Sequence, residues 1–382
     1  MLKNKDKGIT LIALVITIII LLILAGISIS ALTNQGLFKN AKAAQNATEK
    51  AEKEQGQRLN EYEDEINKYL NNSNEDEKIG LITDNMNKEL SKTDNTKLKD
   101  EKGNRIVVPA GFKIVNGATT VDKGIVIEDV TETATKGSQF VWIPVGTITK
   151  SDGTTATITL GRYDFNFTTG VESAYSGTYV EEDSNDSSTL KKYGNTIAKN
   201  ITKFKNSVAT NGGYYIGRYE ARTATARSAA GNVLTQITEK GTENVYNYVT
   251  QLQAAQLSQN MYNNDNFTSD LMNSYAWDTA TVFIQNCGTN AKYSRQISLN
   301  TSLLQTGTNS LTDTSKIDVQ CNIYDMASNI LEWTTETTDS SSFPCVYRGG
   351  FYGNSDHYTS CRDGNSTSDS NVIVGFRPLL YL

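Results

Sequence analysis

The feature that most limits how this chain can fold is an uncharged, mostly apolar run close to its N-terminus. The run extends from Ile9 to Leu32 and covers 24 residues without a charged side chain. A helix of about 20 apolar residues is long enough to cross the hydrocarbon core of a bilayer. The sequence therefore predicts a transmembrane helix, with the rest of the chain held on one side of the membrane.

The residues before the run indicate which side that is. Lys3, Lys5 and Lys7 outnumber the single Asp6, and short basic flanks stay in the cytoplasm. We therefore expect a membrane-anchored protein whose bulk is extracytoplasmic, at the cell surface. A cleaved signal peptide would have a shorter apolar region ending in small residues, and the segment Ala25 to Ser28 leaves that alternative open. A plain signal anchor is a further alternative.

The apolar run is followed by a segment with the pattern of an amphipathic helix. Apolar side chains recur mostly at steps of three and four, which places them on one helical face. These residues are Ala44, Ala47, Ala51, Leu59, Tyr62, Ile66 and Tyr69. We expect a stalk over residues 9–71, with helix to about Leu70, roughly 90 Å long at about 1.5 Å per residue; a helix lying on the globular domain fits the same pattern. Residues 72–104 are polar and predict a linker.

Residues 105–382 have a different composition, with fewer charges and more Thr, Ser, Asn, Gly and Tyr. Short β-rich runs between turn residues, such as Gln139 to Val145, predict strands. Two segments, Asn244 to Met261 and Asp270 to Asn286, have helical character instead. The fold class expected is therefore α+β, with a long N-terminal helix and one globular domain.

Composition also excludes several classes of function. The net charge is −6, with 36 basic and 42 acidic residues and no basic cluster outside the stalk, so nucleic acid is not expected as a partner. The single histidine, His357, excludes mechanisms that need several imidazoles from this chain. The four cysteines form no CxxC pair, and disulfides or buried free thiols are both compatible with their spacing.

The N-terminal residues Lys7-Gly8-Ile9-Thr10-Leu11-Ile12 resemble the type IV prepilin signature. The resemblance implies that residues 1–8 are a leader, that a prepilin peptidase cleaves after Gly8, and that Ile9 becomes an N-methylated N-terminus. It also implies other pilin subunits as partners. Pilins usually carry a glutamate at the fifth mature position, where this chain has Ala13. That departure favours a tip subunit, a minor pilin or a simple anchored protein over an ordinary shaft subunit.

Several motifs toward the C-terminus resemble the formylglycine-generating enzyme (sulfatase-modifying factor) family. Its usual motifs are D-M-x-G-N-V-x-E-W, R-G-G and G-F-R, and Ser328 stands here in place of the glycine. The matching segments are Tyr324 to Thr334, Tyr347 to Gly350 and Gly375 to Pro378, with two earlier strands at Phe140 to Gly146 and Tyr214 to Glu220. The resemblance covers about residues 107–382 and implies a C-type-lectin-like fold.

Most of these motif residues have a structural interpretation as well. The paired Gly349 and Gly350 permit a close backbone approach that a Cβ atom would block. Trp333 and Phe376 are expected as core anchors.

The charged motif residues suggest buried pairs and a cation site. Arg348 and Arg377 could form bidentate pairs with Glu332 or Asp325. Asn329 and Glu332 are candidate oxygen ligands for Ca²⁺, as in the corresponding family loop.

The family's oxidase chemistry requires two copper-binding cysteines between R-G-G and G-F-R. The expected pair would fall between Asn354 and Thr359, before Arg362, and this stretch contains no cysteine. Cys361 has no partner in the segment, and hydroxyl or amide groups do not replace soft thiolate ligands for Cu(I). The sequence therefore indicates a binding protein rather than an enzyme, with an extracytoplasmic formylglycine-generating-type oxidase or maturation enzyme as the alternative.

The segment Phe351 to Asn371 combines aromatic residues with small hydrogen-bonding residues and lacks Lys, Glu, Gln, Met, Trp, Leu and Ala. This composition is typical of adaptable recognition surfaces. It resembles the diversified loop of lectin-fold variable proteins, although an ordinary polar surface loop fits too. We expect an adhesin or a minor or tip pilin that binds an extracellular protein or glycan, while a purely structural minor pilin is a third possibility. The candidate ligand-binding residues are Phe351, Tyr352, Asn354, Asp356, His357, Tyr358 and Arg362.

Overall fold

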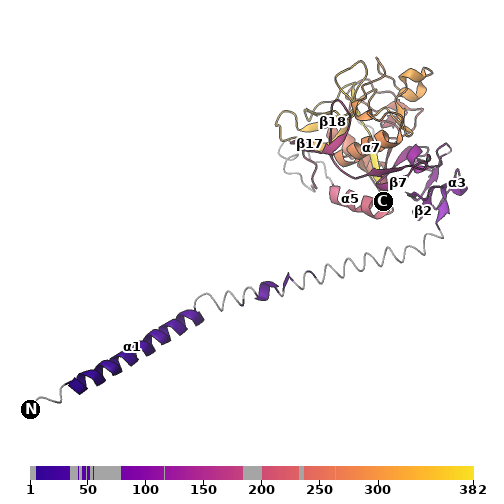
Figure 1. Ribbon diagram of the computed structural model, residues 1–382. Helices are drawn as coiled ribbons and strands as arrows, with labels where there is room; N and C mark the ends of the chain where they lie inside the picture. The colour runs from indigo at the N-terminus through magenta and orange to yellow at the C-terminus, as the bar shows by residue number, and fades with distance from the viewer. Residues whose placement is uncertain are drawn as a thin grey trace, which may run out of the picture. The chain divides into compact units, whose positions relative to one another are not determined.

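The computed structural model divides the chain into two compact units, Met1–Lys78 and Ile79–Leu382. In the first unit it describes residues 6–34, 42, 45–48, 50–51 and 55. In the second unit it describes all residues except 116, 184–199, 232–235 and 263. Figure 1 colours the described residues along the chain.

The first unit contains one long helix, α1 (Asp6–Asn34), of 29 residues. Gly8 and Ile9, between which the leader is expected to be cleaved, lie near its start. Among the residues that the structure describes, no helix combines the length and the apolar character needed to cross a membrane. The expected continuation of the stalk to Leu70 lies largely outside the described residues, as do leader residues 1–5.

The second unit is a mixed α and β domain in which strands predominate, as the composition predicted. Its helices are α3 (Ile82–Asn85), α5 (Ile201–Asn211), α6 (Gln251–Met261) and α7 (Ser274–Cys287), with 3₁₀ turns η2 (Val121–Lys123), η3 (Tyr293–Arg295), η4 (Thr308–Ser310) and η5 (Thr314–Lys316). Its strands are β1 (Gly80–Leu81), β2 (Thr96–Lys99), β3 (Arg105–Val108), β4 (Phe112–Ile114), β5 (Val126–Asp129), β6 (Gln139–Pro144), β7 (Gly146–Thr149), β8 (Thr155–Ile158), β9 (Tyr163–Phe165), β10 (Glu172–Ala174), β11 (Gly213–Gly217), β12 (Arg222–Thr223), β13 (Asn244–Val245), β14 (Thr268–Leu271), β15 (Val319–Gln320), β16 (Ile323–Tyr324), β17 (Leu331–Thr337), β18 (Cys345–Arg348), β19 (Arg362–Asn365), β20 (Val374–Phe376) and β21 (Pro378–Tyr381).

Two sheets organise this unit. The larger has six antiparallel strands in the order β14-β21-β11-β6-β5-β4. The smaller has the order β19-β18-β17-β20, and its β17–β20 pair is parallel. Helix α7 packs against β6 of the larger sheet and β17 of the smaller one, and Figure 1 shows it close to β17 and β18. The two strands predicted from the family resemblance are confirmed as β6 and β11.

The two predicted helices exist but begin later than expected. Helix α6 starts after Thr250, whose hydroxyl accepts a hydrogen bond from the Gln253 backbone while the Gln253 side chain reciprocates, a capping box. Helix α7 starts after Asn273, whose side chain accepts from Ala276 N. The residues before these caps are strands β13 and β14, and β14 pairs with the C-terminal strand β21. Caps and strand pairing therefore set the boundaries, which periodicity alone misplaced.

The polar linker expected over residues 72–104 is shorter than predicted. From Ile79 onward the chain belongs to the globular unit, where β2 pairs with β3. Ile82 and Leu98 are buried in the core. Asp100 is buried as well, and its carboxylate accepts hydrogen bonds from the backbone of Asn104 and Val121. A few well-spaced apolar residues were enough to fold a segment whose composition is mostly polar.

The motif residues form the scaffold of the smaller sheet. Trp333 and Phe376 are fully buried, which confirms them as core anchors. Gly349 has φ +84°, and a Cβ atom there would lie 2.7 Å from the carbonyl oxygen of Met326. A Cβ atom on Gly350 would collide with the carbonyl oxygen of Ala327. The glycine pair is therefore required for the close approach of two backbone segments.

One of the predicted ion pairs is confirmed and the other has different partners. Arg377 donates to both carboxylate oxygens of Glu332, at 3.0 and 2.5 Å, and both side chains are buried. Burial alone would lower the pKa of Arg377, but the adjacent Glu332 carboxylate raises it overall. Arg348 instead pairs with acidic residues of α7 and β17, described below.

Other carboxylates are also buried in the globular unit. Asp318 accepts hydrogen bonds from the Tyr293 hydroxyl at 2.8 Å and from Ala327 N at 3.0 Å. Burial, together with the nearby Asp325 carboxylate, raises the pKa of Asp318 to about 7. Burial likewise raises the pKa of Glu220 and Glu239 well above the ordinary value. The folded unit therefore binds protons more tightly than the unfolded chain, and these groups destabilise it as the pH rises.

The first prediction concerns this pH dependence. Because the pKa of Asp318 rises from 3.8 to about 7 on folding, its stabilising contribution is complete below about pH 4 and is lost as the pH rises toward 7. In the variant Asp318→Asn the side-chain amide can keep both contacts, donating to the Tyr293 hydroxyl and accepting from Ala327 N. We expect wild type to lose about 2–3 kcal/mol more unfolding free energy than Asp318→Asn between pH 5 and pH 7.

Urea denaturation followed by tryptophan fluorescence measures this, because all three tryptophans, Trp142, Trp277 and Trp333, are buried in the globular unit. Asp265→Asn, at an exposed position, is the control and should retain the wild-type pH dependence. Equal losses in wild type and Asp318→Asn would contradict the prediction.

Candidate ligand-binding site

The predicted recognition segment connects β18 to β20 and includes β19. Its first half is fixed to the segment around η3 by three backbone hydrogen bonds. Gly353 N donates to Asn300 O at 2.9 Å, Thr359 N to Gln296 O at 3.0 Å, and Ser360 N to Ser294 O at 3.1 Å. The loop therefore lies on a defined neighbour, and residues from the two segments form one surface.

Four of the predicted ligand-binding residues mainly support the loop itself. The Asn354 side-chain oxygen accepts hydrogen bonds from the backbone N–H groups of Asp356 and His357, at 2.7 and 2.9 Å, which is a turn-forming role. The Phe351 ring packs edge-on against both Tyr352 and His357, with centroid distances of 6.3 and 5.4 Å. His357 Nε2 also lies 3.6 Å from the Asp363 carboxylate. These contacts shape the loop more than they offer groups to a ligand.

Tyr358 has a different environment, because it is part of a three-residue stack. The Arg295 guanidinium carbon lies 3.3 Å from the centroid of the Tyr358 ring and 3.7 Å from that of Phe167. The two rings are 6.1 Å apart and nearly perpendicular. Phe167 keeps 72% of its surface exposed. The stack therefore presents an arginine between two aromatic rings at the protein surface, a favourable cation–π arrangement.

Two surface hollows flank this stack, and Arg295 and Tyr358 line both. The first hollow encloses about 400 Å³, and its lining includes Tyr163, Asp164, Phe165, Tyr175, Tyr179 and Arg362. The second hollow encloses about 460 Å³ and is also lined by Phe167, Ile297, Ser355 and Asp356. Of the predicted residues, the structure thus places Asp356, Tyr358 and Arg362 around these hollows.

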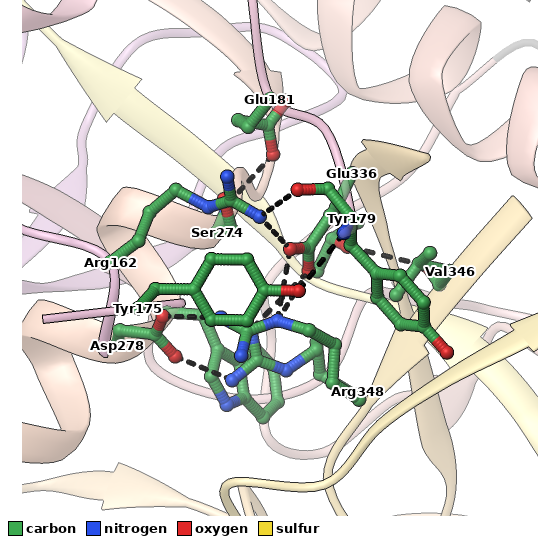
Figure 2. A network of polar contacts seen from close by, with 12 residues as sticks. Arg162, Tyr175, Tyr179, Glu181, Ser274, Asp278, Glu336, Val346 and Arg348 are labelled. Carbon is green, nitrogen blue, oxygen red and sulfur yellow. Dashed lines mark hydrogen bonds and ion pairs between the residues drawn. The ribbon is translucent and has the colours of Figure 1, made fainter. Parts of the chain in front are cut away.

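Arg362 belongs to a charged network beneath the first hollow. Its guanidinium lies 2.5 Å from Asp278 and 2.9 Å from the Glu336 carboxylate. Arg348 also pairs with both acids, at 2.5 Å to Asp278 and 3.5 Å to Glu336. Arg162 donates to Glu336 as well. Figure 2 shows Arg162 near Glu336 and Arg348 near Asp278 within this cluster. Three arginines therefore share two buried carboxylates.

The network carries one more positive than negative charge, and an aromatic ring offsets part of this. The Tyr175 ring has the Arg162 guanidinium carbon 4.3 Å from its centroid and that of Arg362 at 4.2 Å. Burial and the charge of Arg362 lower the pKa of Arg348, although Asp278 opposes this. For Arg362, burial alone lowers the pKa, but the Asp278 and Glu336 carboxylates raise it overall. The contacts with the Arg162 and Arg362 guanidinium groups hold the Tyr175 ring in place as a wall of the first hollow.

Asn329 and Glu332, the candidate Ca²⁺ ligands, are engaged by other protein groups. Glu332 is paired with Arg377. The Asn329 amide donates to Glu220 at 2.8 Å, and its oxygen accepts from Leu304 N at 3.0 Å. Among the residues described, no three His, Cys, Asp or Glu side chains are grouped as a metal site. These contacts favour a structural role for both residues over Ca²⁺ binding.

All four cysteines are free thiols, which agrees with one of the two alternatives left open by their spacing. Cys345 lies opposite Asn365 in the β18–β19 ladder, whereas Cys361 precedes β19 at its other end, so the two do not pair. Burial raises the pKa of Cys361, and it raises that of Cys287 to about 12. A high pKa keeps a thiol protonated and unreactive.

Several site residues carry no recognisable signal in the sequence. Phe167, Tyr175 and Arg295 lie far before Tyr358 and Arg362 along the chain, in positions without motif or periodicity. Only the loop composition pointed to this region, and it could not identify the residues that other segments contribute.

Comparisons with known proteins add little. No protein-family model matches the sequence, and no curated protein is similar to it. Among solved structures, Treponema denticola variable protein 1 is similar at 13% identity and a TM-score of 0.33, over 65% of this chain and 98% of that one. A structure described as the crystal structure of CarF is 15% identical with a TM-score of 0.26, over 36% of this chain and 67% of that one. TM-scores this low establish neither a shared fold nor a shared function.

The second prediction concerns the charged network. Asp278→Ala should lower the free energy of unfolding by about 3–5 kcal/mol, because it leaves the fully buried Arg348 without its closest carboxylate. Urea denaturation with tryptophan fluorescence measures the loss. As the control, Glu132→Ala removes the exposed partner of Lys136 and should leave the midpoint unchanged. Equal midpoints for the two variants would show that the network does not stabilise the fold.

Proposed function

We propose that this chain is a surface-displayed binding protein: a membrane-anchored, pilin-like adhesin or minor pilin whose globular unit binds a ligand without transforming it. The observation that carries the proposal is the pair of hollows beside the Arg295 stack. Tyrosine and arginine are among the side chains most enriched at binding hot spots, and both occur on the shared rim of the hollows. The predicted loop supplies Tyr358, Asp356 and Arg362 to this surface.

The anchor is supported by the sequence. The 24 uncharged residues from Ile9 to Leu32 follow a basic leader, and an apolar helix of that length can cross a bilayer core. Processing after Gly8 and display outside the cytoplasm follow from the prepilin resemblance.

A C-type-lectin-like fold of the formylglycine-generating enzyme type is proposed for the globular unit. It is supported by the way in which the motif residues come together: Gly349 and Gly350 against Met326 and Ala327, and Glu332 with Arg377. The same motifs favour a scaffold over the oxidase, since the loop has no cysteine pair and Cys361 is separated from Cys345. We therefore favour binding over catalysis.

The third prediction tests the binding surface. The full-length chain is screened on glycan and protein arrays, and the affinity for each hit is then measured for single variants. Tyr358→Ala should weaken binding at least about tenfold, which corresponds to about 1.4 kcal/mol, because it removes the wall shared by both hollows. Phe343→Ala removes an exposed aromatic ring outside either lining and should bind as wild type. Equal binding by Tyr358→Ala and wild type would remove this surface as the site.

The fourth prediction tests the anchor. N-terminal sequencing of protein extracted from cell envelopes should find Ile9 as the first residue, with a methylated amine. A start at Met1 or near Ser28 would contradict prepilin-type processing, and recovery of the chain in the cytosol alone would contradict the anchor.

A further inference from the structure

The Arg295 guanidinium differs from the other arginines around the site in having no carboxylate acceptor among the described residues. Arg162, Arg348 and Arg362 each donate to a buried carboxylate. Within the described part of the chain, Arg295 contacts only the Phe167 and Tyr358 rings through its guanidinium. A guanidinium has five N–H donors in one plane, and no hydrogen bond from those of Arg295 to another described residue is present. Arg295 lines both hollows, so these donors are available to a ligand bound there.

The position of Arg295 is fixed before any ligand arrives. It ends the 3₁₀ turn η3, where its backbone N–H donates to Lys292 O at 2.8 Å. The backbone N–H of the preceding residue, Ser294, donates to Gln285 Oε1 of α7 at 2.9 Å. The stacked rings then hold the side chain itself. A pre-positioned arginine loses little conformational freedom when it binds a planar anion, which is the condition for a strong bidentate contact.

The second hollow supplies groups that complement these donors. Asp356 and Ser355 offer hydrogen-bond acceptors and a hydroxyl, and Phe167, Tyr358 and Ile297 offer apolar faces. Ile297 is 39% exposed and Phe167 72% exposed, so both faces are open to a ligand. A carboxylate such as Asp356 can accept from two neighbouring hydroxyls. The lining thus combines one cationic fork, one acceptor for hydroxyls and a flat apolar wall.

We propose, on the basis of the binding function proposed above, that the second hollow binds a hexuronic acid unit of an acidic glycan. Arg295 pairs with the sugar carboxylate, Asp356 and Ser355 bind ring hydroxyls, and the C–H face of the sugar ring lies against Phe167 and Ile297. A peptide C-terminus has a carboxylate too, but it lacks the ring hydroxyls that Asp356 and Ser355 can bind. The hollow therefore favours a polyhydroxylated acid over a peptide.

The experiment uses the full-length chain and small probes in matched pairs. Binding of methyl glucuronide and methyl galacturonide is measured by saturation-transfer NMR and calorimetry, against methyl glucoside and methyl galactoside, which have the same rings without the carboxylate. At least one uronide should bind at least about tenfold more tightly than its neutral counterpart, a difference of about 1.4 kcal/mol. A peptide with a free C-terminal carboxylate, and the same peptide amidated, form the competing arm.

Variants then assign the contact to Arg295. Arg295→Gln should reduce uronide affinity at least about tenfold, and Arg295→Lys, which keeps the charge but loses the planar fork, should reduce it measurably as well. Lys316→Gln removes one exposed positive charge elsewhere and should bind the uronide as wild type. Unchanged tryptophan fluorescence shows that each variant is folded, and if Arg295→Gln does not fold, Arg295→Lys decides.

The inference is overturned if neither uronide binds, if binding is equal for uronide and neutral sugar, if the carboxylate peptide binds instead, or if Arg295→Lys and Arg295→Gln bind the uronide as wild type. These results can occur while an array ligand still depends on Tyr358, in which case the binding function stands and only the ligand class is wrong. Loss of both would remove the binding function itself.

Discussion

Two carboxylates on one buried strand constrain the whole globular unit. Glu332 and Glu336 lie four residues apart on β17, and both are fully buried. An unpaired buried carboxylate costs several kcal/mol, so β17 can be buried only when arginines from other segments arrive with it. Arg377 neutralises Glu332, while Arg162, Arg348 and Arg362 surround Glu336. These contacts connect segments from residue 162 to residue 377, and α7 joins them through Asp278.

This network also lies below the proposed binding surface. Arg362 uses its donors on Asp278 and Glu336, and with Arg162 it holds the Tyr175 ring between two guanidinium groups. The loop above it is fixed by backbone hydrogen bonds, such as that from Thr359 N to Gln296 O. Backbone contacts of this kind do not depend on side-chain identity, so this attachment of the loop does not use the side chains at positions such as 356 and 358.

The sequence was informative about burial and backbone geometry but not about distant partners. Local patterns identified the glycine pair Gly349 and Gly350, the core residue Trp333 and the strand that begins at Gln139. They could do so because adjacent residues in the chain determine a close backbone approach or an apolar run. The pair of Arg377 with Glu332 was one of several combinations that the motifs allowed. Asp278, the principal partner of Arg348, lies 70 residues away in a helix, and no pattern marks it. Loop composition likewise pointed to Tyr358, but it did not distinguish Tyr358 from Asn354, whose side chain forms the turn. It also gave no indication of Arg295, which lies in another segment.

The distribution of reactive groups is compatible with the binding function proposed above. Catalytic sites place groups with shifted pKa values in an accessible cleft. Here the acids whose pKa is strongly raised, such as Asp318 and Glu239, are buried in the scaffold and line neither hollow. The carboxylates below the first hollow, Asp278 and Glu336, are paired with arginines. The groups left at the surface are an arginine held between rings, an aspartate and tyrosines, which can hold a ligand by charge, hydrogen bonds and stacking.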